Sequence, residues 1–153
     1  MWPVERFLDL ANRLVSTCRA RILLILGPAE EELKEVFLRI TGSEHAIVLD
    51  TLPLPQLGAV LERCHVFVGN DSGVAHLAAA LGVSVVAIFG PTDPVRWAPR
   101  GENVRVIRRA ISCSPCEREI MARCDRRRCL LEISVDEVYT AVYQWIGGGV
   151  ESI

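Results

Sequence analysis

The sequence of 153 residues has only one lysine, Lys34, and its 17 basic and 19 acidic residues leave a net charge of −2. This balance excludes a disordered acidic tail and a globally basic nucleic-acid-binding protein. No stretch reaches the roughly 18 to 20 uncharged apolar residues that cross a bilayer. The amino terminus, with Glu5, Arg6 and Asp9, is too polar for a secretory signal. We therefore expect a cytoplasmic protein.

Apolar residues make up half of the chain, which is enough for one core and favours a sheet buried on both faces. Strand patterns alternate with helical patterns of about ten residues, which indicates parallel crossover units. We predict an α/β fold with a Rossmann-like parallel sheet, helices on both faces and a single domain over residues 1–153. The predicted strands lie at residues 22–26, 46–49, 65–68, 83–89 and 104–107, and the predicted helices at 4–15, 30–40, 55–64, 74–81 and 135–146.

The most informative stretch is VGNDSGVAH at residues 68–76, where a buried strand pattern enters a helix through a turn of small residues. Backbone N–H groups at a helix start are unpaired and the helix dipole is positive there, so Ser72 and Gly73 form a candidate phosphate cradle. His76 follows one turn later and is a candidate hydrogen-bond donor to a diphosphate. The alternative stays open that Asp71 or Ser72 only caps the helix and that His76 is a packing residue.

A second stretch, IFGPTDP at residues 88–94, is followed by Trp97 and Pro99. Its prolines predict a rigid rim beside the first loop, because ligands bind such sheets beyond the carboxyl ends of the strands. The alternative is a proline-rich turn in which Trp97 is a hydrophobic plug.

Four cysteines cluster at Cys113, Cys116, Cys124 and Cys129. Their spacing makes them candidate ligands of a structural zinc ion, and free thiols are an equal alternative, whereas a disulfide framework is less expected in a reducing compartment. Residues 105–129 also hold eight arginines against three acidic residues, a local net charge of +5. Such a block is either an anion-facing surface or a solvated face. It lacks the interleaved aromatics of a nucleic-acid-binding segment.

Residues 68–82 and 86–94, with Trp97 and Pro99, resemble the carboxy-terminal domain of glycosyltransferase family 9, the ADP-heptose:lipopolysaccharide heptosyltransferase group. The resemblance includes Trp2-Pro3, residues 26–30 and 51–61, the CSPC run at residues 113–116, and Cys129-Leu130. It therefore covers nearly the whole chain.

This resemblance implies the second, donor-binding half of a GT-B enzyme that transfers a heptose or a related sugar to a lipopolysaccharide core-type acceptor. The implied ligands are an ADP-heptose-like nucleotide sugar and an anionic glycolipid, with peripheral contact to the inner membrane and no nucleic acid. Transfer requires no cofactor, so any zinc is structural. The residues implied to contact or border the donor are Asp71, Ser72, Gly73, His76, Glu30, Gly90, Pro91 and Thr92.

The general base belongs to the amino-terminal domain of such enzymes, so we expect no catalytic residue in this chain and no activity of the chain alone. We expect that the strand that precedes the Trp-Pro pair in the family is missing here and that the sheet is interrupted. Two other readings remain: a non-catalytic nucleotide-binding or interaction module and, less favoured, a zinc-stabilised nucleic-acid binder.

Overall fold

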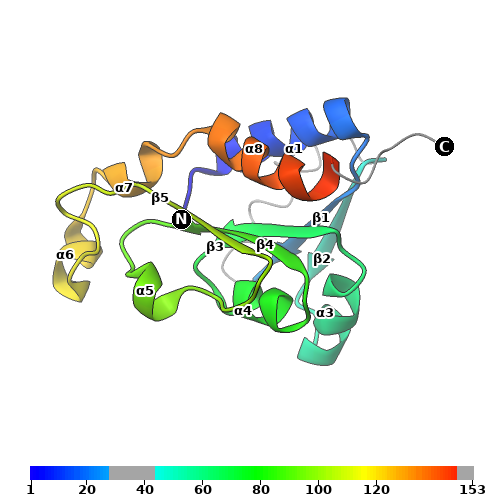
Figure 1. Cartoon of the computed structure of the whole chain (residues 1–153), viewed down its shortest axis with the longest axis horizontal. Helices are drawn as coiled ribbons and strands as arrows, with labels where there is room; N and C mark the ends of the chain where they lie inside the picture. The colour runs from blue at the N-terminus through cyan, green and yellow to red at the C-terminus, as the bar shows by residue number, and fades with distance from the viewer. Residues whose placement is uncertain (28–43, 148–153) are drawn as a thin grey trace. The chain divides into compact units, whose positions relative to one another are not determined.

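The computed structural model describes residues 1–27 and 44–147 (Figure 1). It divides into two compact units, one formed by Met1–Pro3 with Gly58–Ile153 and the other by Val4–Leu57. This division into units does not test the single domain expected from the sequence, which stays a prediction. Glu30 and the helix expected at residues 30–40 lie outside the described residues. Within the described part, no helix is both long enough and apolar enough to span a membrane.

In the unit Val4–Leu57, the structure describes a long helix followed by two parallel strands. Helix α1 spans Val4–Cys18, strand β1 spans Ile22–Leu26 and strand β2 spans Ala46–Asp50. The apolar stripe of α1 explains its packing, because residues three to four apart share one face of a helix. Leu8 and Ala11 are buried on this face and pack with the partly buried residues Val4, Phe7, Ile22 and Leu24. Helix α3, Leu54–Leu61, crosses the division between the units.

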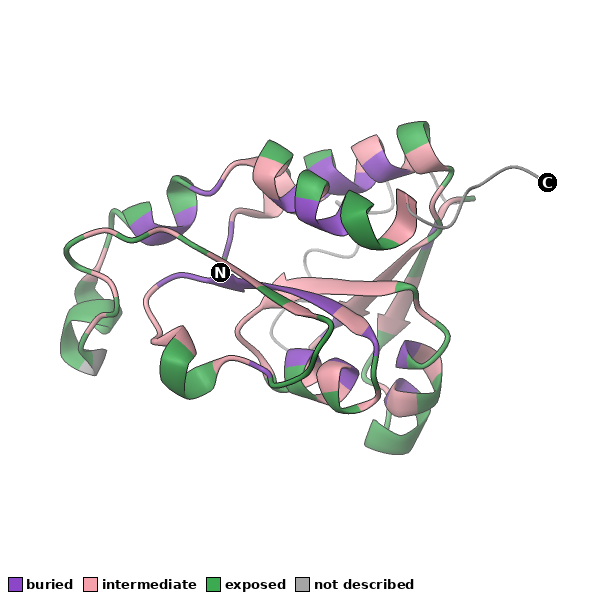
Figure 2. Ribbon diagram, in the orientation of Figure 1, coloured by how far each residue is buried: buried purple, intermediate pink, exposed green. Residues whose placement is uncertain are grey.

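The other unit contains a three-stranded parallel sheet in the order β3-β4-β5. Its strands are Val66–Asn70, Ser84–Phe89 and Val104–Arg108. Helix α4, Gly73–Ala80, lies against one face of this sheet, and α8, Val135–Ile146, lies against the other (Figure 1). Both faces of β4 are therefore covered, and its last five residues are buried (Figure 2). The predicted α/β class with helices on both faces of a parallel sheet is confirmed.

The strands do not form one continuous sheet. Strands β1 and β2 pair with each other, whereas β3, β4 and β5 form a separate sheet, and no described strand hydrogen-bonds to both groups. The two groups of strands belong to different units, so the interrupted sheet that the sequence leads us to expect stays a prediction.

Helix α8 begins with a capping box that is tied to the end of the three-stranded sheet. The Ser134 hydroxyl accepts the Glu137 N–H, and the Glu137 carboxylate accepts the Ser134 N–H at 2.9 Å. Arg109, just after β5, forms an ion pair with the same carboxylate. Burial by itself raises the pKa of Glu137, but the hydrogen bonds from Ser134 and the Arg109 guanidinium outweigh it and hold that pKa below its usual 4.5.

Three short helices occur where the sequence predicts no helix: α5 at Pro94–Trp97, α6 at Arg118–Arg123 and α7 at Arg128–Leu131. Each has six residues or fewer, which is too short for a hydrophobic repeat to be recognised. Local signals do mark one of them, because Asp93 caps α5 by accepting the Val95 N–H at 3.0 Å.

Candidate functional site

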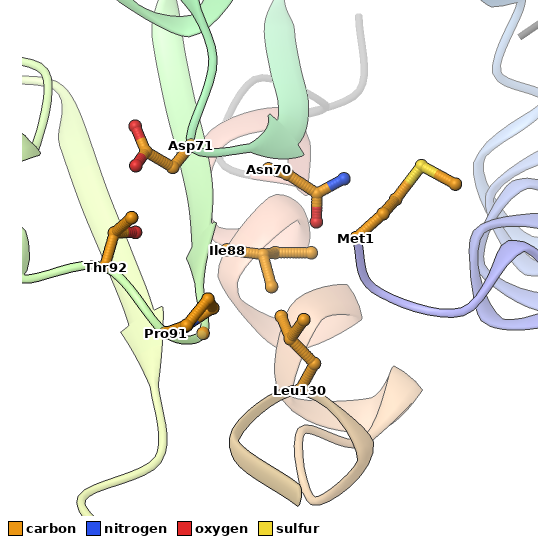
Figure 3. Close-up of a pocket in the computed structure, with 8 residues that line it drawn as sticks. Met1, Asn70, Asp71, Ile88, Pro91, Thr92 and Leu130 are labelled. Carbon is orange, nitrogen blue, oxygen red and sulfur yellow. The ribbon is translucent and has the colours of Figure 1, made fainter. Parts of the chain in front are cut away.

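A pocket of about 140 Å³ lies at the carboxyl ends of β3 and β4 (Figure 3). The two strands are parallel and pair Asn70 with Ile88, so their last residues meet at one edge of the sheet. This is the edge at which open α/β sheets bind ligands. The pocket is lined by Met1, Asn70, Asp71, Ile88, Gly90, Pro91, Thr92 and Leu130.

The rim of the pocket after β4 is held by the segment that carries the first two clustered cysteines. The Ser114 hydroxyl donates to the Gly90 carbonyl at 2.7 Å, and the Cys116 N–H donates to the Pro91 carbonyl, also at 2.7 Å. Both acceptors are backbone carbonyls of the rim, so these bonds fix its path without using a side chain of the rim itself. The rigidity of the rim, predicted from its prolines, stays a prediction.

Gly90 is required where the rim meets α7. A Cβ atom added to Gly90 would lie 2.5 Å from Cγ of Leu130, well inside contact distance. Gly90 and Leu130 are both buried. The absence of a side chain at Gly90 thus allows Leu130 to close one wall of the pocket.

The start of α4 follows directly in sequence from Asp71, which lines the pocket. Ser72 is the N-cap of α4, and its hydroxyl accepts the Ala75 N–H at 3.4 Å. The N–H groups of Gly73 and Val74 donate to no acceptor in the part of the chain that the structure describes. Two donors at the positive end of a helix dipole therefore remain available to an anion.

The residues predicted for the site separate into two groups. Asp71, Gly90, Pro91 and Thr92 line the pocket. Ser72, Gly73 and His76 are not among its lining residues; they occupy the N-cap and first turn of α4, where His76 is exposed. Their contact with a donor stays a prediction, as does the contact of Glu30, which lies outside the described residues.

Sequence reasoning missed four lining residues: Met1, Asn70, Ile88 and Leu130. Asn70 and Ile88 could have been found, because each lies at the end of a predicted strand next to a predicted site loop. Leu130 could not, since its place in the wall depends on a contact between residues forty positions apart, Gly90 and Leu130.

All six cysteines are free thiols, and the four clustered ones influence one another electrostatically. Burial raises the pKa of the Cys129 thiol, and Cys116, Cys113 and Cys124 raise it further. Burial, Cys113 and Cys124 likewise raise the pKa of Cys116. Both groups are therefore neutral thiols near pH 7. Among the described residues, no three Cys, His, Asp or Glu side chains are arranged to hold a metal ion, so structural zinc stays a prediction.

The parallel sheet and the pocket at the carboxyl ends of its strands define an open α/β domain. Residues 1–123 match the model of the family described as "Glycosyltransferase family 9 (heptosyltransferase)". The chain belongs to this family.

Curated relatives agree with the family match. The chain is 33% identical to lipopolysaccharide heptosyltransferase 3 of Escherichia coli K12 over 109 residues, which cover 67% of this chain and 30% of that protein. It is also 33% identical to lipopolysaccharide heptosyltransferase 1 of Pseudomonas aeruginosa over 115 residues, which cover 75% of this chain and 32% of the relative. The chain thus spans about a third of the length of these relatives.

Solved structures give the same result for the fold. The family 9 glycosyl transferase of Veillonella parvula superposes with a TM-score of 0.82 at 25% identity, over 97% of this chain and 42% of that one. The E. coli heptosyltransferase WaaC with ADP superposes with a TM-score of 0.73 at 25% identity, over 94% and 39% of the two chains. The described fold therefore corresponds to part of a family 9 enzyme.

Proposed function

We propose that this chain is the part of a family 9 glycosyltransferase that binds a nucleotide-sugar donor of the ADP-heptose type, for transfer of a heptose or related sugar to a lipopolysaccharide core-type acceptor. The proposal is carried by the N–H groups of Gly73 and Val74, the first two residues after the N-cap Ser72. Within the described residues these groups donate to no acceptor, and they follow Asp71, which lines a pocket at the edge of the sheet. A relative of this fold was solved with ADP.

The residues of the site suit the diphosphate of such a donor. The N–H groups of Gly73 and Val74 stabilise negative charge, and this charge increases on the leaving nucleotide when the glycosidic bond breaks. His76, exposed one turn further along α4, would add a hydrogen bond to the same group. The Asp71 carboxylate would be repelled by a diphosphate, so we assign it to hydroxyl groups of the sugar.

Binding of ADP tests this assignment at a single backbone donor. Gly73 is the first residue of α4, a position that accepts proline because no helical hydrogen bond is lost there. Gly73→Pro removes one N–H, and we expect it to weaken ADP binding about tenfold, the usual effect of losing a hydrogen bond to a charged group. Isothermal titration calorimetry of the purified chain measures the change.

Gly73→Ala is the matched control. It keeps the N–H group, and its added Cβ meets no atom within 4 Å, so ADP affinity should stay near that of the wild type. We expect binding without sugar transfer by the isolated chain. No ADP binding by the wild-type chain would contradict the proposal and favour a non-catalytic interaction module, and turnover of ADP-heptose would contradict the assignment of the general base to another domain.

We also propose that this protein is cytoplasmic and meets its anionic glycolipid acceptor at the membrane surface through α6, α7 and the turn between them. Arg123, Arg126 and Arg127 are exposed and form no ion pair within the described residues. Ile120, in the same segment, is 55% exposed, and Leu131 is 47% exposed. Exposed apolar side chains among unpaired arginines fit the interface of an anionic bilayer.

Vesicle sedimentation tests this surface. We expect the chain to bind phosphatidylglycerol vesicles at low salt more tightly than phosphatidylcholine vesicles. Arg126→Ser with Arg127→Ser should weaken this binding roughly thirtyfold, since each arginine near the surface contributes about 1 kcal/mol. Arg63→Ser with Arg100→Ser, which removes the same charge from other exposed positions, should weaken it much less. Equal losses in the two pairs, or a preference for oligonucleotides, would contradict the proposal.

A further inference from the structure

Trp2 lies far from the strand ends in sequence but contacts them in the fold. Its side chain is completely buried, and its indole Nε1–H donates to the Ile133 carbonyl at 3.0 Å. Its backbone N–H donates to Oδ1 of Asn70 at 2.9 Å. The side chain of Trp2 is therefore anchored by Ile133, the residue before the N-cap of α8, and its backbone is anchored by Asn70, the last residue of β3.

The bond from Trp2 fixes which way the Asn70 amide faces. An amide has one acceptor oxygen and one NH₂ donor, and only the oxygen can accept the Trp2 N–H. The Asn70 NH₂ group donates to no acceptor in the described part of the chain. No buried side-chain nitrogen or oxygen lacks a partner among the described residues, so this NH₂ group is accessible, and Asn70 lines the pocket.

Two neighbouring residues, Asn70 and Asp71, place hydrogen-bond donors and an acceptor on different sides of this pocket. The amide of Asn70 extends toward Met1, whereas the carboxylate of Asp71 extends toward Thr92 (Figure 3). This divergence follows from their position at the end of β3, because successive side chains of an extended strand point to opposite sides. A ligand in the pocket thus meets two N–H donors on one side and an acceptor on the other.

We infer that Asn70 is a further binding residue, which donates hydrogen bonds from its NH₂ group to an acceptor oxygen of the bound nucleotide sugar, and that Trp2 is the positioning residue that orients it. The inference rests on the proposed function. The acceptor oxygen belongs either to the diphosphate or to the sugar, and these two sources are separated by comparing ADP with ADP-heptose as the titrant.

Asn70→Asp is the decisive variant because it removes the NH₂ donors of Asn70 and keeps the size and shape of the side chain. The aspartate still accepts the Trp2 N–H, but both donors are replaced by a negatively charged oxygen. We expect ADP-heptose binding to weaken at least tenfold, as for a lost hydrogen bond with a ligand oxygen. ADP binding falls equally if the oxygen belongs to the diphosphate and falls much less if it belongs to the sugar. Calorimetric titration gives both values.

Asn103→Asp is the matched control. Asn103 is exposed and precedes β5, at the opposite edge of the sheet from the pocket, so the same change of charge should leave both affinities nearly unchanged. Equal affinity of wild type and Asn70→Asp would overturn the inference while leaving the proposed function intact. A wild-type chain that binds neither ligand would overturn both.

The positioning role of Trp2 is tested with Trp2→Phe, which removes the indole N–H bond to Ile133 and leaves a smaller aromatic ring in the buried site. At a temperature where the variant is fully folded, we expect about threefold weaker ADP-heptose binding. In an Asn70→Ala background the same change should have no effect on affinity, because the group that it orients is absent. An unchanged affinity of the folded single variant, or equal losses in both backgrounds, would overturn this role.

Discussion

Trp2→Ala is expected to lower the free energy of unfolding by roughly 3–5 kcal/mol, the range for truncating a buried large aromatic side chain. Trp2 is 0% exposed and is the largest fully buried side chain among the described residues. The variant also leaves the Ile133 carbonyl without its indole donor, which adds to the loss. Guanidinium unfolding followed by far-ultraviolet circular dichroism measures the difference.

Trp97→Ala is the matched control for this prediction, because the same side chain is removed from an exposed position. Trp97 is 51% exposed, and its ring contacts the Arg96 guanidinium at 5.2 Å. We expect a loss below about 1 kcal/mol there. Similar losses in the two variants would contradict the structural role assigned to Trp2.

Gly90→Ala is expected to destabilise the protein by about 1–3 kcal/mol and to weaken ADP binding, because the added methyl group forces Leu130 out of the pocket wall. Leu130→Ala alone should cost about 2–5 kcal/mol, since Leu130 is buried. The double variant should lose less free energy of unfolding than the two single variants lose together, because the alanine at position 90 then occupies space that Leu130 has vacated. Thermal and guanidinium unfolding of the four proteins complete the cycle.

Gly73→Ala controls for the general effect of replacing glycine by alanine, since its Cβ points into open space. Its stability should differ from the wild type by only a few tenths of a kcal/mol. Additive losses at Gly90 and Leu130 would mean that the two residues do not share the space that the structure gives them.

Much of the fold could be predicted from the sequence, because its strands are short apolar runs and its longer helices carry a clear repeat. Strand β1 and helix α8 occur at the predicted residues, Ile22–Leu26 and Val135–Ile146. The motif beginning at Val68 correctly indicated the edge of the sheet at which the pocket lies, because a parallel strand followed by a turn of small residues marks the carboxyl-end edge.

The rest of the site depends on contacts between distant residues. The hydrogen bond from Trp2 to Asn70 joins residues 68 positions apart, and no local pattern indicates it. The exposure of His76 depends on which face of α4 packs against the sheet. The apolar spacing in this alanine-rich helix does not determine that face. The sequence marked the cysteines correctly as a cluster, but their spacing does not determine whether they bind metal.

The lining of the pocket has a thermodynamic consequence. It combines Met1, the ends of β3 and β4 and Leu130 of α7, so its walls come together only when nearly the whole of this unit has folded. A ligand that fits these walls binds the native state and not the unfolded chain. Occupancy and folding are therefore linked by mass action: ligand at a hundred times its dissociation constant stabilises the native state by about 2.7 kcal/mol. A ligand bound in this pocket would thus stabilise contacts between segments that lie far apart in the sequence.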